Sequence, residues 1–241
     1  MTSTTATLPP SHAAKPPAAP RRRLRDAPSR LLHWLLAIGV VGAYATSEWD
    51  SARAVHALLG YGVVGVLVLR LLWGLVGPRS ARIGGLVTRV RAALKAGLRP
   101  EAGWTVRVGG TIALTGLGLL LLAAPATLSG VALLHSGWAG EWLEEVHEAL
   151  GSALPLLALG HAVALAAAVA LRGRQALSPM LSGTVPGPGP DVTPRNHLGV
   201  AVLCGLVLTA FLWGQWDSVQ TAVADTAAVG HHDRRHGDDD D

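Results

Sequence analysis

Five apolar blocks alternate with polar segments along the 241-residue chain. A helix rises about 1.5 Å per residue, so about 20 apolar residues cross a hydrocarbon core of about 30 Å. The pattern therefore predicts an all-α, polytopic membrane protein with five transmembrane helices, and Pro125 is expected to kink the third helix or end its regular part. The blocks lie at about residues 31–47, 54–76, 108–134, 146–171 and 197–216.

The polar segments divide the chain into five expected units. Residues 1–25 are rich in Pro, Ala, Ser and Thr and end in a basic run, which is typical of a disordered tail. Residues 26–183 hold the first four helices as one domain. A Pro/Gly linker over 184–195 leads to the fifth helix over 196–217, and a His/Asp-rich tail over 218–241 follows it.

An alternative interpretation makes the first apolar block a cleaved signal peptide. A basic region precedes this block, and Ala43-Tyr44-Ala45 fits the small-x-small cleavage rule. His33 and Trp34 inside the block argue against cleavage, as does the length of the tail before it. A membrane-spanning first helix is therefore preferred.

The distribution of charge predicts how the helices cross the membrane. If the N-terminus is cytoplasmic, most of the 20 Lys and Arg residues fall on the inner side and most of the 16 acids on the outer side. The positive-inside rule then predicts a multi-pass protein of the bacterial inner membrane, with a cytoplasmic N-terminus and a periplasmic C-terminus. The net charge of +4 follows from these inner segments, so nucleic acid is not an expected partner.

Composition narrows the chemistry further. Half of the residues are hydrophobic and 15% are charged, against about 25% charged in a typical soluble domain, which excludes an ordinary soluble globule. The single cysteine, Cys204, excludes a disulfide framework and a cysteine-ligated zinc or iron–sulfur site.

Four histidines fall within the apolar blocks at matching depths. From His147 to His161 the helix rises about 21 Å, and the turn of about 100° per residue brings the chain back to nearly the same face. His56 begins the second helix at the outer level, and His33 begins the first helix at the inner level. Two cross-helix pairs are therefore expected, His33 with His161 and His56 with His147.

Two imidazoles that face each other in a helix bundle are typical of bis-histidine haem ligation. Zinc usually takes a third or fourth protein ligand, and none accompanies the inner pair. Iron with two axial imidazoles has no open position, which favours electron transfer over oxygen binding. A proton relay is the competing interpretation, although a relay does not need paired depths, and each histidine taken alone is equally well an ordinary packing residue.

Arg70 follows His56 at the same spacing as His161 follows His147, hence on nearly the same face and at the inner level. A haem propionate or a quinone-side contact would pair its charge, and snorkelling to the inner surface is the plain alternative. Other residues that accompany the histidines are glycines; they fit a flat cofactor, but ordinary helix packing explains any one of them. They are Gly60, Gly62, Gly65, Gly151 and Gly160.

Five stretches of the chain form a recognisable set: Arg25-Asp-Ala-Pro-Ser-Arg-Leu-Leu-His33-Trp34, His56-Ala-Leu-Leu-Gly60-Tyr61, Leu69-Arg70-Leu-Leu-Trp73-Gly74-Leu-Val-Gly77-Pro78-Arg79, Val146-His147-Glu148 with His161, and Met180-Leu-Ser-Gly183. Taken together, these segments resemble the bacterial cytochrome b561 / nickel–iron hydrogenase b-type cytochrome family. They cover about residues 25–183. One departure is Gly103–Gly110, which lacks the histidine that many members carry before the third helix, so a quinone or substrate role of that segment is in doubt.

The resemblance implies a four-helix transmembrane dihaem bundle, here with a fifth helix added. It implies two b haems with His33, His56, His147 and His161 as axial iron ligands, and Arg70 as a propionate or quinone-side contact. It also implies electron transfer between the quinone pool and a redox partner at the outer face, such as a periplasmic cytochrome c.

Two further functions remain open on the sequence. One is a small quinone-linked oxidoreductase that uses the same haems with superoxide or another small oxidant; the other is a haem-poor membrane anchor whose His/Asp tail binds metal. The outer acids Glu141, Glu144, Glu145 and Glu148 either dock a basic partner or simply form a solvated helix start. The oligomeric state also stays open, a homodimer included.

Overall fold

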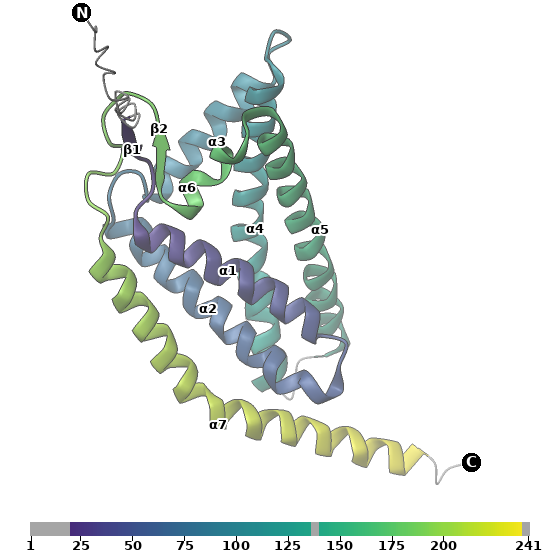
Figure 1. Cartoon of the computed structure of the whole chain (residues 1–241). Coiled ribbons are helices and arrows are strands. Elements are labelled where there is room, and N and C mark those ends of the chain that lie inside the picture. Colours follow the sequence, from purple (N-terminus) through teal and green to yellow (C-terminus); the bar gives the residue numbers. More distant parts are fainter. Residues whose placement is uncertain (1–19, 136–139, 238–241) are drawn as a thin grey trace, which may run out of the picture.

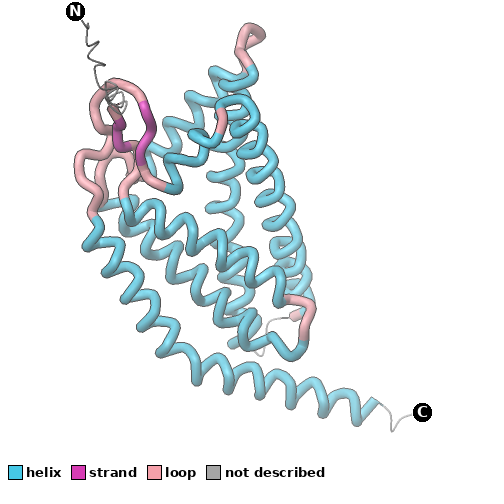
Figure 2. Tube along the Cα trace, in the orientation of Figure 1, coloured by secondary structure: helices cyan, strands magenta, loops and turns pink. Residues whose placement is uncertain are grey.

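The computed structural model describes residues 20–135 and 140–237, and the side chains of Arg89 and of 225–237 lie outside that description. Most of the described chain is helical (Figures 1 and 2). The helices are α1 (Ala27–Thr46), η1 (Asp50–Ala52), α2 (Arg53–Val76), α3 (Ile83–Gly97), α4 (Trp104–His135), α5 (Glu141–Arg172), η2 (Arg174–Leu177), α6 (Ser178–Leu181) and α7 (Leu198–Gly237), and the strands are β1 (Arg21–Arg23) and β2 (Thr184–Pro186).

Four helices, α1, α2, α4 and α5, form a bundle. α1 pairs with α2, α4 pairs with α5, and contacts of α2 with α4 and of α1 with α5 join the two pairs. α7 packs outside the bundle, mainly along α2 (Figure 1). Buried Val63 and Val66, neighbours on α2, belong to two different core clusters, so α2 is packed on more than one side.

Four helical segments are long and apolar enough to cross a membrane, as expected for a polytopic helical bundle. α1 is not among them, because Arg30 and His33 lower its mean hydropathy. A total of five membrane crossings, with α1 as one of them, therefore stays a prediction. Pro125 lies inside the continuous α4, so it does not end that helix. The four segments are Asp50–Val76, Trp104–His135, Glu141–Arg172 and Leu198–Ala224.

The start of α1 is fixed by a buried carboxylate. One oxygen of Asp26 caps the helix by accepting from the Ser29 amide at 3.2 Å, and the other accepts from Trp73 Nε1 on α2 at 3.0 Å. Asp26 and Trp73 are 1% and 8% exposed, so the bond between them is shielded from water and ties α1 to the end of α2.

The segment between the second and third apolar blocks contains an additional helix, α3. α3 packs against α4, with Val90 buried and the Ala93 carbonyl close to Gly110 of α4. Its exposed positions include Arg91. Short apolar runs interrupted by basic residues explain both the amphipathic helix and the failure of the block pattern to reveal it.

The N-terminal tail and the Pro/Gly linker also differ from expectation. Residues 21–23 form β1 and pair antiparallel with 184–186 of β2, and Leu24 and Arg25 both donate their amides to the Gly183 carbonyl. We call the end of the bundle that carries these strands the strand end, and the opposite end, where η1 joins α1 to α2, the η1 end (Figure 2). The helix expected over 196–217 is part of α7, which continues to Gly237 through much of the expected tail.

Candidate functional site

The first histidine pair joins α1 to α5 and lies nearer the strand end. The ring centroids of His33 and His161 are 6.4 Å apart, and the ring planes are inclined by 55°. Both side chains are half-buried. The structure thus brings together the two residues that the sequence pairs at the inner level.

The second pair joins α2 to α5 and lies nearer the η1 end. The centroids of His56 and His147 are 6.1 Å apart, with the rings perpendicular at 90°. α5 therefore contributes one histidine to each pair, while α1 and α2 contribute one each. Both expected pairings are present, and the role of these residues as ligands stays a prediction.

Hydrogen bonds at Nδ1 determine which ring nitrogen is left for a ligand. The Nδ1–H of His56 donates to the Ala43 carbonyl at 2.8 Å, and that of His147 donates to the Ala126 carbonyl at 3.0 Å. A carbonyl only accepts, so Nδ1 carries the proton in both rings, and in the neutral imidazole Nε2 then holds the lone pair. This tautomer is the one that binds a metal through Nε2.

His161 is held through a hydroxyl group instead. Its Nδ1 lies 2.9 Å from Oγ1 of Thr115, whose own hydrogen is directed to the Thr111 carbonyl at 2.8 Å. The hydroxyl oxygen is then the acceptor, and His161 takes the same tautomer as His56 and His147. Ser129 Oγ makes the corresponding contact with His147 Nδ1 at 3.0 Å.

The separation within each pair fits one iron atom held between two imidazoles. With metal–nitrogen bonds of about 2 Å and ring centroids about 1 Å beyond each nitrogen, two axial imidazoles have centroids about 6 Å apart. Within the described residues, no group of three or more His, Cys, Asp or Glu side chains is placed to hold a metal ion. Two-ligand sites are therefore the metal chemistry that this bundle offers.

Glycines of α4 let the histidine rings lie close to that helix. A Cβ on Gly130 would come within 2.8 Å of His147 Cε1, and one on Gly116 would lie 3.6 Å from His161 Cε1. Sequence reasoning singled out other glycines. Of those, Gly65 admits Leu208 of α7, where a Cβ would be 2.7 Å away, so packing explains it.

Around Gly60 and Gly151 there is room for a flat group. Each lies one helical turn after a histidine of the second pair, and nothing lies within 4 Å of where a Cβ would sit. Gly116 and Gly130 could have been found from the sequence by their separation along the chain, which equals that of His147 and His161.

Outside the two histidine pairs, Arg70 and His135 each have a hydrogen-bond partner within the protein. Arg70 donates from Nη1 to the Ala81 carbonyl at 3.1 Å, which holds the turn after α2. His135, at the end of α4, forms a hydrogen bond between its Nε2 and the Tyr61 hydroxyl group. The four glutamates at the start of α5 are exposed. The His/Asp tail falls in side chains and residues outside those described.

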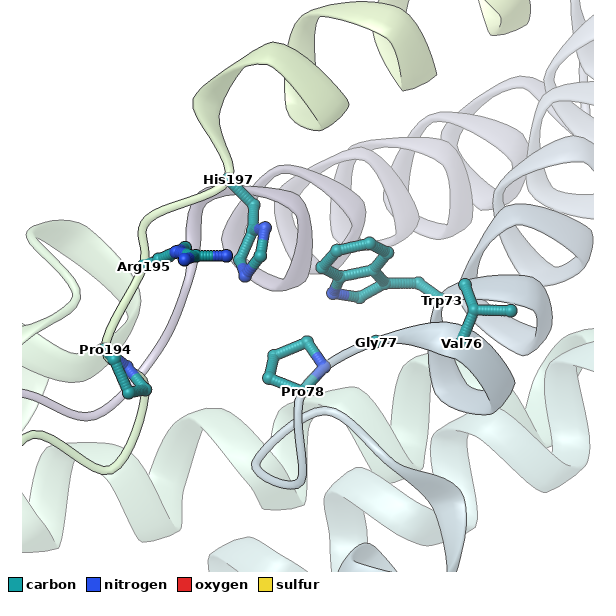
Figure 3. A pocket seen from close by; sticks show the side chains of 7 residues that line it. All are labelled: Trp73, Val76, Gly77, Pro78, Pro194, Arg195 and His197. Atoms are coloured by element: carbon teal, nitrogen blue, oxygen red, sulfur yellow. The ribbon is translucent and has the colours of Figure 1, made fainter.

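A pocket of about 490 Å³ lies at the strand end, between the end of α2 and the start of α7 (Figure 3). His197 has a φ of +51° and packs edge-on against Trp73, with centroids 5.3 Å apart. Figure 3 shows His197 between Arg195 and Trp73, with Pro78 on the adjacent wall. The pocket therefore combines an aromatic wall with two polar side chains.

A family model described as prokaryotic cytochrome b561 matches residues 24–183. No curated protein and no solved structure matches the chain. The match covers the four bundle helices and α6 and ends just before β2.

Proposed function

The chain belongs to the prokaryotic cytochrome b561 family, which makes it a membrane b-type cytochrome of electron transfer, and from this premise we propose that it holds two b haems. His33 and His161 bind the inner haem, and His56 and His147 bind the outer haem. The strand end faces the cytoplasm and the η1 end faces the periplasm. The protein then carries electrons across the inner membrane between the quinone pool and a periplasmic redox partner.

The observation that carries this proposal is the presence of two histidine pairs at two depths, with centroid separations of 6.4 and 6.1 Å. Bound haem supplies a one-electron ferric/ferrous couple. Each histidine pair would supply two ligands to its haem iron, which would leave no position open for oxygen. The Ala43 and Ala126 carbonyls keep the protons of His56 and His147 on Nδ1 and so keep their Nε2 atoms available.

The strand-end pocket is our candidate for the quinone ring. Trp73 offers an aromatic wall, and His197 and Arg195 offer hydrogen-bond donors for the two ring carbonyls. Trp73 belongs to the same packed cluster as Leu32, the neighbour of His33, so this pocket is on the side of the inner haem. Arg70 is proposed to contact a propionate of that haem as well as the Ala81 carbonyl.

Exposed glutamates at the start of α5 support a basic periplasmic partner. Opposite charge steers encounter between redox proteins, and this effect falls with ionic strength. A quinone-linked reaction with superoxide would instead proceed without a protein partner. Two assays of the purified protein separate these activities: reduction of quinone with superoxide as the electron donor, and oxidation of quinol with a basic cytochrome c as the electron acceptor.

The direct test is haem per polypeptide in detergent-purified protein, read with a dithionite-reduced minus oxidised spectrum. About two haems and a low-spin α-band are expected. His147→Ala is expected to lose the outer haem and His161→Ala the inner haem, while the matched control His135→Ala keeps two. Two haems in either ligand variant would refute the assignment, and no haem in the parent protein would turn attention to the anchor hypothesis.

A further inference from the structure

α4 presents the same arrangement to α5 twice. A hydroxyl residue followed by a glycine occurs as Thr115-Gly116 and again as Ser129-Gly130, about four helical turns later. His147 and His161 of α5 have the same separation along the chain. The two helices pack against each other, and so each histidine meets one copy of the arrangement.

We propose that Thr115 and Ser129 are positioning residues that set the ligand strength of His161 and His147 and thereby adjust the reduction potentials of the inner and outer haems independently. This inference rests on the proposed function, since it takes the two histidines as iron ligands. The two hydroxyl groups act through the histidine rings and do not themselves touch the iron.

The inner site depends on its hydroxyl group more than the outer site does. Thr115 Oγ1 is the direct hydrogen-bond partner of His161 Nδ1, at 2.9 Å, although the Ile112 carbonyl also faces this ring. His147 Nδ1 reaches both Ser129 Oγ and the Ala126 carbonyl at 3.0 Å. Removing the hydroxyl of Ser129 therefore leaves His147 with a strong acceptor, and removing that of Thr115 leaves His161 without its closest one.

The sign of the effect follows from imidazole basicity. A hydrogen bond from Nδ1–H makes Nε2 a stronger donor and stabilises the ferric state over the ferrous state. Loss of that bond weakens the ferric preference, so the reduction potential rises. A tenfold loss of that preference corresponds to about 59 mV for one electron.

The test uses two substitutions that remove a hydroxyl group and change the packing around the histidine ring little. Thr115→Val replaces one hydroxyl by a methyl group of similar size, and Ser129→Ala removes the other. Thr127→Val is the matched control on the same helix, because Thr127 Oγ1 donates to the Ala123 carbonyl at 2.8 Å and to the Ala124 carbonyl at 3.1 Å within α4.

The experiment is a potentiometric titration of purified holoprotein together with ferric EPR spectra and haem content. Each variant is measured in the full protein and in the single-haem backgrounds His147→Ala and His161→Ala, so that every shift is assigned to one haem. Thr115→Val is expected to raise the inner potential by about the tenfold equivalent, Ser129→Ala to raise the outer potential by less, and Thr127→Val to change neither. Thr115→Ser is expected to restore the parental value.

Loss of the inner haem alone in Thr115→Val, with recovery in Thr115→Ser, would also support the inference. Equal shifts of both haems, or shifts no larger than those of Thr127→Val, would overturn it. If the single-haem backgrounds keep two haems, the ligand assignment itself is wrong. If they lose one haem each and Thr115→Val changes nothing, only this inference is wrong.

Discussion

Gly130→Ala is the substitution that most directly tests the packing around His147, at the proposed outer haem site. The position of a Cβ on Gly130 is 2.8 Å from Cε1 of His147, and the two ring nitrogens lie at 3.3 and 3.5 Å. Real Cβ atoms essentially never approach this closely. The His147 ring must move by about 0.6 Å to restore an ordinary contact of 3.4 Å.

A displacement of that size matters because a ligand ring must hold its position to within about 0.5 Å. It also pulls Nδ1 of His147 from the Ala126 carbonyl, which accepts its hydrogen at 3.0 Å. Gly116→Ala is the matched control, since its Cβ would lie 3.6 Å from His161, an ordinary contact. Both substitutions gain about 1 kcal/mol of helix propensity, so this contribution cancels in the comparison.

The assay is haem per polypeptide followed by a reductive titration of each purified variant. Gly130→Ala is expected to weaken outer-haem binding by about 10–100-fold, the range seen when the support of a metal ligand is lost. Gly116→Ala is expected to keep both haems with parental potentials. If Gly130→Ala and Gly116→Ala behave alike, then Gly130 does not set the position of His147, and the reasoning from the close approach of His147 to α4 is refuted.

Three further changes test the scaffold. Trp73→Phe leaves the buried Asp26 carboxylate without one donor and is expected to cost about 1–3 kcal/mol, seen as a lower Tm in detergent; an unchanged Tm would contradict the anchoring role. Gly65→Val crowds Leu208 and Phe211 of α7, because a Cβ there would lie 2.7 Å from Leu208 Cδ1 and 3.4 Å from Phe211 Cδ1, and overpacking of about 1–3 kcal/mol is expected in the same assay. Glu145→Cys is expected to react with an impermeant maleimide from the periplasm of intact cells, and labelling only after lysis would reverse the proposed orientation.

The apolar blocks predicted most of the architecture, because each block coincides with a helix of the structure. The histidine pairs were also predictable. Depth and face follow from the spacing of His147 and His161 on one regular helix, and the depths of His33 and His56 follow from helix direction. These predictions needed only periodicity and the thickness of a bilayer, and the periodicity is a local property of the sequence.

The supporting residues were not predicted, because they act across helices. Ser129 and Thr115 look like ordinary polar positions in an apolar block, and only the packing of α4 on α5 brings them to Nδ1 of the histidines. The pairing of β1 with β2 joins the two segments that flank the family match, which short runs of basic and Pro/Gly residues do not reveal. The repeat of a hydroxyl residue before glycine in α4 was the one readable signal.

The segment that leads into α7 contacts the four-helix bundle and helps to hold it together. The family match ends at residue 183, yet the Asn196 carbonyl accepts the amide of Ala27 at 2.9 Å, and Thr193 shares a buried hydrogen bond with Ser80. The linker thereby holds the start of α1 and the turn after α2. α1 and α2 are the helices that supply His33 and His56, the histidines that face α5. α4 and α5 fix the depth of both sites by their shared spacing, but α1 and α2 must be held at the correct height for the rings to meet. In this chain the segment beyond residue 183 contributes to that second requirement, so shortening it is expected to disturb both proposed haem sites together.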